Sequence, residues 1–137
     1  MIEPAWILPA DFPDDLTGWE GFVYCITDTQ TGKAYIGKRN FWMRRGKRIL
    51  PSNWQRYWGS SVELRIDLKV FGYERFERRI LSLHRTAFVL GYEEVAAQIR
   101  ADVLRAKLPD GSPAYYNRSV NGRWFARQFP EWAPAQA

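Results

Sequence analysis

Residues 24–37 read Y-C-I-T-D-T-Q-T-G-K-A-Y-I-G, and this stretch decides the fold. It lies across two short segments, 21–27 and 34–37, that are rich in β-branched and aromatic side chains and are typical of strands. The glycine of the intervening D-T-Q-T-G-K can adopt the positive φ that a tight turn requires. The stretch therefore predicts a β-hairpin, with Tyr24 in its first strand and Tyr35, eleven positions later, in its second.

Two interpretations of this tyrosine pair are open at this point. Tyrosines on a strand often pack half-buried against the core, with no chemical role. A phenol can also hold a proton or orient a water molecule in an active site. The fourteen residues do not distinguish these interpretations. Cys25 should point to the opposite face from Tyr24, because successive side chains of a strand alternate, and we expect it in the core.

The rest of the chain predicts one further strand and two longer helices. Ser60 or Ser61 can cap the first helix, which Gly72 ends. F-E-R-R-I-L-S-L, beginning at residue 76, predicts the third strand, and residues 86–105 predict the longest helix. The order β-β-α-β-α is typical of an α+β domain, here a small three-stranded antiparallel sheet flanked by helices.

The length of 137 residues indicates one domain. We divide the chain into an acidic, proline-containing arm (1–20), a folded domain (21–125) and a C-terminal tail (126–137). The single cysteine excludes an intrachain disulfide, and one cysteine with one histidine, His84, exclude a zinc site of the usual kind. No apolar run is long enough to span a membrane, and the N-terminus is not a secretory signal, so we expect a cytoplasmic protein.

Positive charge is concentrated in residues 38–58, although the net charge of the chain is only +5. This segment has no acid, whereas residues 1–20 have no lysine or arginine. The segment predicts a basic loop with one helical turn over 42–47 and a short helix over 54–58. Cations interleaved with aromatic side chains suit contact with nucleic acid, and the alternative is a solvated loop. The seven cations are Lys38, Arg39, Arg44, Arg45, Lys47, Arg48 and Arg56.

Several motifs together resemble the GIY-YIG nuclease family, although the first half reads F-V-Y where the family usually has G-I-Y. The resemblance covers residues 21–120 and is closest to phage- and homing-type members. The matching motifs, in chain order, are Y-C-I (24–26), Y-I-G (35–37), W-x-x-Y-x-G-S-S (54–61), the helical Y-E-E-V-A-A-Q-I-R-A-D-V-L (92–104) and Y-Y-N (115–117).

The resemblance implies a DNA endonuclease that uses one divalent ion, Mg²⁺ or Mn²⁺, in the cytoplasm of a bacterial or phage-infected cell. It assigns the metal to Glu94, which stands two residues after Tyr92 and four before Gln98, as in the family's Y-x-E-x-x-x-Q pattern. Glu93 would point about 100° away on the same helix. The alternative is that both glutamates are first-turn acids that stabilise the helix dipole.

We assign the two tyrosines to positioning the attacking water and handling its proton. Following the family, we expect Tyr24 to be the general base or to position the water, and Tyr35 to hydrogen-bond the water or the scissile phosphate. A free phenol has a pKa near 10, too high for a good base at neutral pH. We expect Lys38 and Arg39 to lower this pKa, because neighbouring cations favour the phenolate.

An arginine should clamp the phosphate, since its planar fork suits that geometry. The family takes this arginine from the first helix after Y-I-G, and we rank Arg39 and Arg45 ahead of Arg56. Asn117 is expected to contact DNA or to tie the final segment to the site. The expected DNA-contacting residues are Lys38, Arg44, Lys47, Arg48, Arg56 and Asn117.

Two other functions remain open for this sequence. One is a DNA-binding module that keeps the fold without the chemistry, and the other is a protein-interaction domain of a phage or mobile element. Because the chain is little longer than the catalytic module, specificity would come from the basic segment, a homodimer or a partner protein.

Overall fold

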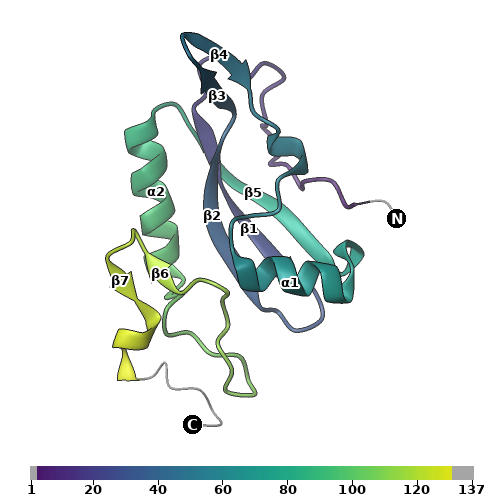
Figure 1. The fold of residues 1–137 in the computed structure, drawn as a ribbon, viewed down its shortest axis with the longest axis vertical. Helices are drawn as coiled ribbons and strands as arrows, with labels where there is room; N and C mark the ends of the chain where they lie inside the picture. Colours follow the sequence, from purple (N-terminus) through teal and green to yellow (C-terminus); the bar gives the residue numbers. More distant parts are fainter. Residues whose placement is uncertain (1–2, 131–137) are drawn as a thin grey trace.

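The structure is a computed structural model, and it describes residues 3–130, so the last seven residues of the predicted tail lie outside it. Figure 1 shows the fold. In chain order the elements are β1 (Gly21–Asp28), β2 (Ala34–Asn40), β3 (Trp42–Arg45), β4 (Arg48–Pro51), η1 (Trp54–Arg56), α1 (Val62–Phe71), η2 (Tyr73–Arg75), β5 (Phe76–His84), α2 (Ala87–Arg100), β6 (Ser119–Val120), β7 (Trp124–Phe125) and η3 (Ala126–Gln128).

The central sheet has three antiparallel strands in the order β2-β1-β5, so the predicted α+β class is confirmed. The register places Tyr24 opposite Gly37 of β2 on one side and opposite Ile80 of β5 on the other. The tyrosine strand β1 is therefore the centre of the sheet, and β2 lies at one edge. Among residues 3–130, no helix is long and apolar enough to cross a membrane.

The two faces of the sheet are covered by different helices. Phe22, Tyr24 and Ile26 of β1 pack in one buried cluster with α1. The intervening residue Val23 packs in a second cluster with Leu90 of α2. This division follows from the alternation of side chains along a strand. Figure 1 shows α1 and α2 against different parts of the sheet, with α2 running beside β2.

The predicted helix boundaries near α1 are confirmed by its caps. The Ser61 hydroxyl accepts a hydrogen bond from the Leu64 N–H at 3.2 Å, which satisfies a donor of the first turn. Gly72 ends the helix with φ 90°, a conformation that suits glycine. The turn before α1 is consequently fixed, and this turn contributes to the site described below.

The N-terminal arm packs on the free edge of the sheet. The Ile7 N–H donates to the Arg78 carbonyl at 2.7 Å, and the Ile80 N–H donates to the Ile7 carbonyl at 3.0 Å. Trp6 is only 8% exposed and belongs to the same cluster as Phe22. The arm therefore closes the β5 edge and completes the core on the α1 side.

Arg78 fastens this arm from inside the protein. Its guanidinium lies between the rings of Trp6 and Trp58, with Cζ 4.8 and 3.9 Å from their centroids. It donates to the main-chain carbonyls of Pro4 at 2.6 Å and of Tyr57 at 2.7 Å. Burial lowers the pKa of Arg78 to about 10, which still leaves the side chain charged at neutral pH.

Three local predictions were wrong. Residues 42–47 form a β-turn hairpin and no helical turn, because Gly46 adopts φ 61° and lets β3 pair with β4. The helix predicted over 54–58 is a 3₁₀ turn that ends at Arg56. The longest helix ends at Arg100 and not at 105, and Asp102 follows it with a left-handed φ of 55°.

Candidate active site

Tyr24 lies below the surface, directly over a glycine of the neighbouring strand. Its side chain is 1% exposed. A Cβ added to Gly37 would stand 2.6 Å from the Tyr24 hydroxyl and 3.0 Å from Cε2 of Tyr35. The glycine of Y-I-G is thus required by packing, because any side chain there would displace the Tyr24 phenol. Cys25, its neighbour, packs on the opposite face as predicted.

Tyr35 occupies the rim of the same site. Its ring centroid is 6.2 Å from that of Tyr24, and its side chain is half-buried. The Tyr35 hydroxyl is 3.2 Å from the hydroxyl of Ser60, an exposed residue in the turn before α1. Tyr57 closes the other side of Tyr24, with 5.9 Å between ring centroids. One phenol is therefore deep and the other can meet solvent.

Glu94 reaches this pair from α2. Burial raises the pKa of its half-buried carboxyl, while the Lys38 ammonium and a hydrogen bond from the Lys38 main-chain N–H lower it in part. A negative charge on Glu94 raises the pKa of both Tyr24 and Tyr35, which places the three groups within electrostatic range of one another. Because Lys38 belongs to the edge strand β2, a side chain from α2 can contact it there.

Glu93, the neighbouring acid on α2, acts on a different part of the protein from Glu94. Its charge acts on His84, at the end of β5, and raises the pKa of that imidazole. Burial has the larger effect and lowers the His84 pKa overall. The His84 ring is 2.8 Å from the Ser82 hydroxyl.

The expected lowering of the tyrosine pKa values was wrong. Burial raises the pKa of Tyr24 well above its ordinary value, and burial also raises the pKa of Tyr35. The expected cations do not face the phenols: Lys38 is exposed, and Arg39 lies over the ring of Tyr57 with Cζ 4.3 Å from its centroid. Both tyrosines consequently keep their protons at neutral pH.

Two amides hold β2 in position behind the site. The Gln98 side chain donates to the Ile36 carbonyl at 2.9 Å. Asn117 accepts from the Ile36 N–H at 3.1 Å and donates to the same carbonyl at 2.8 Å. Asn117 is 3% exposed, so the predicted DNA contact is not available to it. Its role is the other predicted one, because it ties the final segment to the Y-I-G strand.

The predicted arginines lie in different places around the site. Arg39 is half-buried, stacks on Tyr57 and donates to the Asn53 side chain at 2.7 Å. Arg45 belongs to the β3–β4 hairpin and is exposed. Arg56, on η1, is exposed as well. The remaining cations predicted to contact DNA are all exposed: Lys38, Arg44, Lys47 and Arg48.

Arg65 is a site residue that sequence reasoning missed. It is the arginine of α1, the first α-helix after Y-I-G, and it is exposed. Its Nε and Nη2 donate to the Gly59 carbonyl at 3.2 and 3.0 Å. Gly59 precedes Ser60, which contacts Tyr35, so the Arg65 guanidinium is held at the same turn. The helical turn wrongly predicted over 42–47 hid this signal, since it supplied an earlier first helix.

The fit of the site to a metal ion depends on Glu94. Within the described part of the chain, three or more His, Cys, Asp or Glu side chains nowhere gather as a metal-binding group. Mg²⁺ commonly binds through one or two carboxylates, retained water molecules and substrate phosphates. A single half-buried carboxylate within electrostatic range of two phenols fits that pattern, whereas it does not fit a zinc site closed by protein ligands.

A tyrosine hairpin, a glutamate on the following long helix and an arginine on the intervening helix define a nuclease domain of the GIY-YIG class. The family model described as "Putative endonuclease segE, GIY-YIG domain" matches residues 6–120. The chain therefore belongs to this GIY-YIG endonuclease family, and the family implies DNA as the substrate. The match begins at Trp6, so it includes the arm that closes the sheet. No curated protein and no solved structure matches the chain significantly.

Proposed function

We propose that this protein is a metal-dependent endonuclease that hydrolyses phosphodiester bonds in DNA. The observation that carries the proposal is that α2 packs on the Y-I-G strand at Gln98, one turn after Glu94, and that the charge of Glu94 raises the pKa of both tyrosines. A DNA-binding module without chemistry would need cations on its surface, but it would need neither a half-buried carboxylate beside two tyrosines nor a glycine shaped to hold one of them.

Glu94 is the residue that would hold one Mg²⁺ or Mn²⁺. A carboxylate whose pKa is raised by burial gains stability in its ionised form when a cation binds it. A bound ion would supply stabilisation of negative charge on the phosphoryl oxygens and would lower the pKa of a water molecule. Lys38 already opposes the charge of Glu94 in part, so the free site tolerates the ionised carboxylate.

The tyrosines act as neutral hydrogen-bonding groups in this proposal. Since burial keeps both phenols protonated, neither is a strong base at neutral pH. Tyr35, at the rim and beside Ser60, orients the attacking water or a phosphate oxygen. Tyr24 supports it from below and fixes the shape of the site through its contact with Gly37. Of the two predicted roles for Tyr24, positioning is therefore preferred to general base.

Arg65 replaces Arg39 and Arg45 as the first candidate for the phosphate clamp. Two of its nitrogens hold the Gly59 carbonyl, which leaves Nη1 directed to other acceptors, and the side chain is exposed to substrate. A planar guanidinium beside the Tyr35–Ser60 pair suits a phosphoryl group whose negative charge increases in the transition state. Arg39 becomes a supporting group, because Tyr57 and Asn53 already occupy it.

Relaxation of supercoiled plasmid in Mg²⁺ or Mn²⁺ tests the proposal. Glu94→Gln keeps the size of the side chain and removes its charge, and we expect cleavage to fall on the order of 100-fold or more. Glu93→Gln is the matched control, because it removes the same charge one position away, and it should cleave like the parent protein. A parent protein that binds DNA without cutting it would favour the inactive binding module. Binding to protein in place of DNA would show a weak salt dependence.

The clamp is tested in the same assay. Arg65→Ala should lower the turnover number at saturating DNA on the order of 100-fold, the usual loss when a transition-state donor is removed. Arg56→Ala removes an equal charge from the nearby η1 and should change turnover little. Equal turnover of Arg65→Ala and the parent protein would return the clamp to Arg39 or Arg45.

A further inference from the structure

The β3–β4 hairpin stands apart from the rest of the protein. Its strands pair with each other and with neither the three-stranded sheet nor the β6–β7 pair. Figure 1 shows it at the top of the view, beyond the end of β2. Seven residues in a row, from Met43 to Ile49, are exposed. A hairpin with so little burial adds little to the stability of the core, and its presence needs another explanation.

The hairpin carries four cations and no acid. Arg44, Arg45, Lys47 and Arg48 are all exposed. Within residues 3–130, the side chains of these four residues form no hydrogen bond and no ion pair. Four like charges on ten residues repel one another, and a polyanion would relieve that repulsion.

The register divides these cations between two faces. Arg45 is paired with Arg48, and Met43 with Leu50, so these four side chains share one face. Arg44 is paired with Ile49 on the opposite face. A two-stranded ribbon thus has one face with two arginines near its tip and another face with one.

The Arg45–Arg48 face leads toward the candidate active site. A concave surface beside Arg39 and Asn53 is lined by Met43 and Arg45 of this face, together with Trp42 and Pro51 at the base of the hairpin. Arg39 stacks on Tyr57, and Tyr57 contacts Tyr24. Near the tip, Ile49 of the opposite face lines a different hollow, together with Trp19 and Arg85. Of the four hairpin cations, Arg45 is therefore the one that lines the hollow beside Arg39, and Arg48 is its cross-strand partner.

We infer that the β3–β4 hairpin lies in the major groove of duplex DNA, with its Arg45–Arg48 face against the groove, next to the phosphate held at the tyrosine site. The inference rests on the proposed function for the position of that phosphate. A four-residue strand is about 13 Å long, and the major groove is about 12 Å wide and 8.5 Å deep and admits a two-stranded ribbon. Arginines at the tip are the side chains that most often read guanine in this groove.

Equal charge removal from the two faces tests this placement. Arg45→Ala/Arg48→Ala removes two charges from the proposed contact face, and Arg44→Ala/Lys47→Ala removes two charges from other positions of the same hairpin. Binding to a 30-base-pair duplex would be measured by fluorescence anisotropy without divalent metal, across a salt series. We expect the first pair to weaken binding about tenfold or more and to reduce the salt slope by about two, and the second pair to change both much less. Unchanged thermal unfolding of both variants would show that the fold is retained.

A chemical footprint distinguishes groove insertion from backbone contact. Dimethyl sulfate methylates guanine N7, which faces the major groove, and the parent protein should protect guanines near the cleavage position. Arg45→Ala/Arg48→Ala should lose this protection, whereas Arg44→Ala/Lys47→Ala should keep it. Equal weakening by both double variants, or no N7 protection, would overturn the inference while plasmid cleavage by the parent still supported the nuclease. A parent protein that neither binds nor cuts DNA would remove both proposals.

Discussion

The two hairpins of this protein follow one another in the chain and are built in opposite ways. The β1–β2 hairpin is buried on both faces, and β1 is the central strand of the sheet. The β3–β4 hairpin is exposed along most of its length and has no second layer. The first hairpin therefore contributes both to the stability of the protein and to the geometry of the site. The second hairpin contributes little to either, and its side chains are available to bind a partner.

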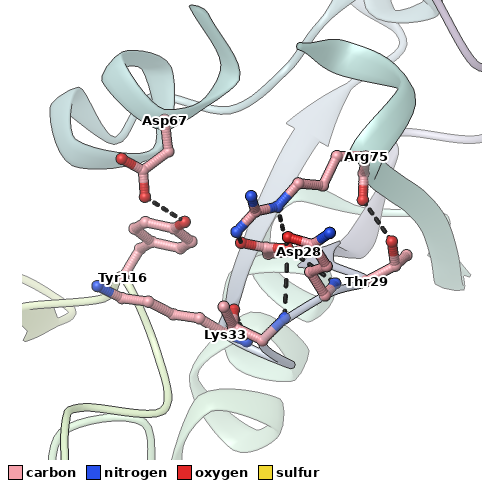
Figure 2. A network of polar contacts seen from close by, with 8 residues as sticks. Asp28, Thr29, Lys33, Asp67, Arg75 and Tyr116 are labelled. Atoms are coloured by element: carbon pink, nitrogen blue, oxygen red, sulfur yellow. Dashed lines mark hydrogen bonds and ion pairs between the residues drawn. The ribbon is translucent and has the colours of Figure 1, made fainter. Parts of the chain in front are cut away.

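The turns of the two hairpins show the same contrast. Asp28 ends β1 and is 2% exposed, and its carboxylate accepts two hydrogen bonds of 2.8 Å from Arg75 and one of 2.9 Å from the Gln30 N–H. Figure 2 shows this network, in which Thr29 also contacts the Arg75 carbonyl. The β3–β4 turn has Gly46 at φ 61°, and a Cβ there would meet no atom within 4 Å.

A second layer of contacts lies beside the first turn. The Tyr116 hydroxyl donates to Asp67 of α1 at 2.7 Å, and the Lys33 ammonium is 4.4 Å from the centroid of the Tyr116 ring. Figure 2 shows the Tyr116 ring between Asp67 and Lys33. The first turn is thereby joined to α1 and to the segment that carries Asn117, so a change there should be felt at the site.

The largest effect is expected from Asp28→Ala. The substitution removes a buried carboxylate that accepts hydrogen bonds from the Arg75 guanidinium and from the Gln30 N–H. Hydrogen bonds to charged groups contribute about 1.5–3 kcal/mol, so we expect the free energy of unfolding to fall by on the order of 3 kcal/mol, measured by urea denaturation. A loss below about 0.5 kcal/mol would show that this turn is no more important than the exposed one.

Gly37→Ala should have the next largest effect, and it should act on both stability and cleavage. Its Cβ would stand 2.6 Å from the Tyr24 hydroxyl, so the phenol must move. Overpacking of this kind costs about 1–3 kcal/mol. Tyr24→Phe removes the hydroxyl oxygen, which is the atom nearest to the added Cβ. The double variant should therefore lose less free energy of unfolding than the sum of the losses in the two single variants. Additive losses in this double-mutant cycle would mean that the two residues are not in contact.

The acid dependence of stability should change in Asp28→Asn. Burial alone raises the pKa of Asp28, but hydrogen bonds from Arg75 and Gln30 outweigh it and the pKa is lowered. Stability from this group is therefore present above the unfolded pKa of about 3.9 and is lost as pH falls through the lower folded pKa. The parent protein should lose stability over this range with a slope up to about 1.4 kcal/mol per pH unit greater than the variant. If the free energies of unfolding of the two proteins changed in parallel from pH 5 to 2, the lowered pKa of Asp28 would be contradicted.

These contrasts also explain what the sequence could and could not predict. The β1–β2 hairpin that carries Tyr24 and Tyr35 and the caps of α1 follow from local patterns, namely alternation, serine caps and glycine turns. The β3–β4 hairpin was missed because R-R-G-K-R is polar throughout, so no alternation of apolar side chains indicated strands. Arg45, one of the two first-ranked candidates for the clamp, consequently lies on an exposed strand and not on a helix.

The tyrosine pKa values could not be predicted for a different reason. The sequence places Lys38 and Arg39 beside Y-I-G, but it does not show that one faces solvent and the other stacks on Tyr57. Burial depends on side chains from distant elements, here the Trp6 and Tyr57 rings that close over Tyr24. Proximity in the chain therefore predicted the wrong direction for the tyrosine pKa shifts, because desolvation outweighs the effect of the nearby charges.

The smallest effect is expected from the turn glycine of the second hairpin. Gly46 and Gly32 both have positive φ, 61° and 86°, so alanine at either position strains the backbone by about 1–2 kcal/mol. At Gly32 this cost falls on the turn that Asp28 holds, and it should appear in the global free energy of unfolding. At Gly46 it falls on a hairpin outside the core, and the global value should change by less than about 0.5 kcal/mol. Hydrogen exchange provides the independent measurement, because amides of β3 and β4 should exchange through low-energy local opening while those of β1 exchange only on global unfolding. Equal global losses for Gly46→Ala and Gly32→Ala would show that the second hairpin is coupled to the core, and slow exchange in β3 would show the same.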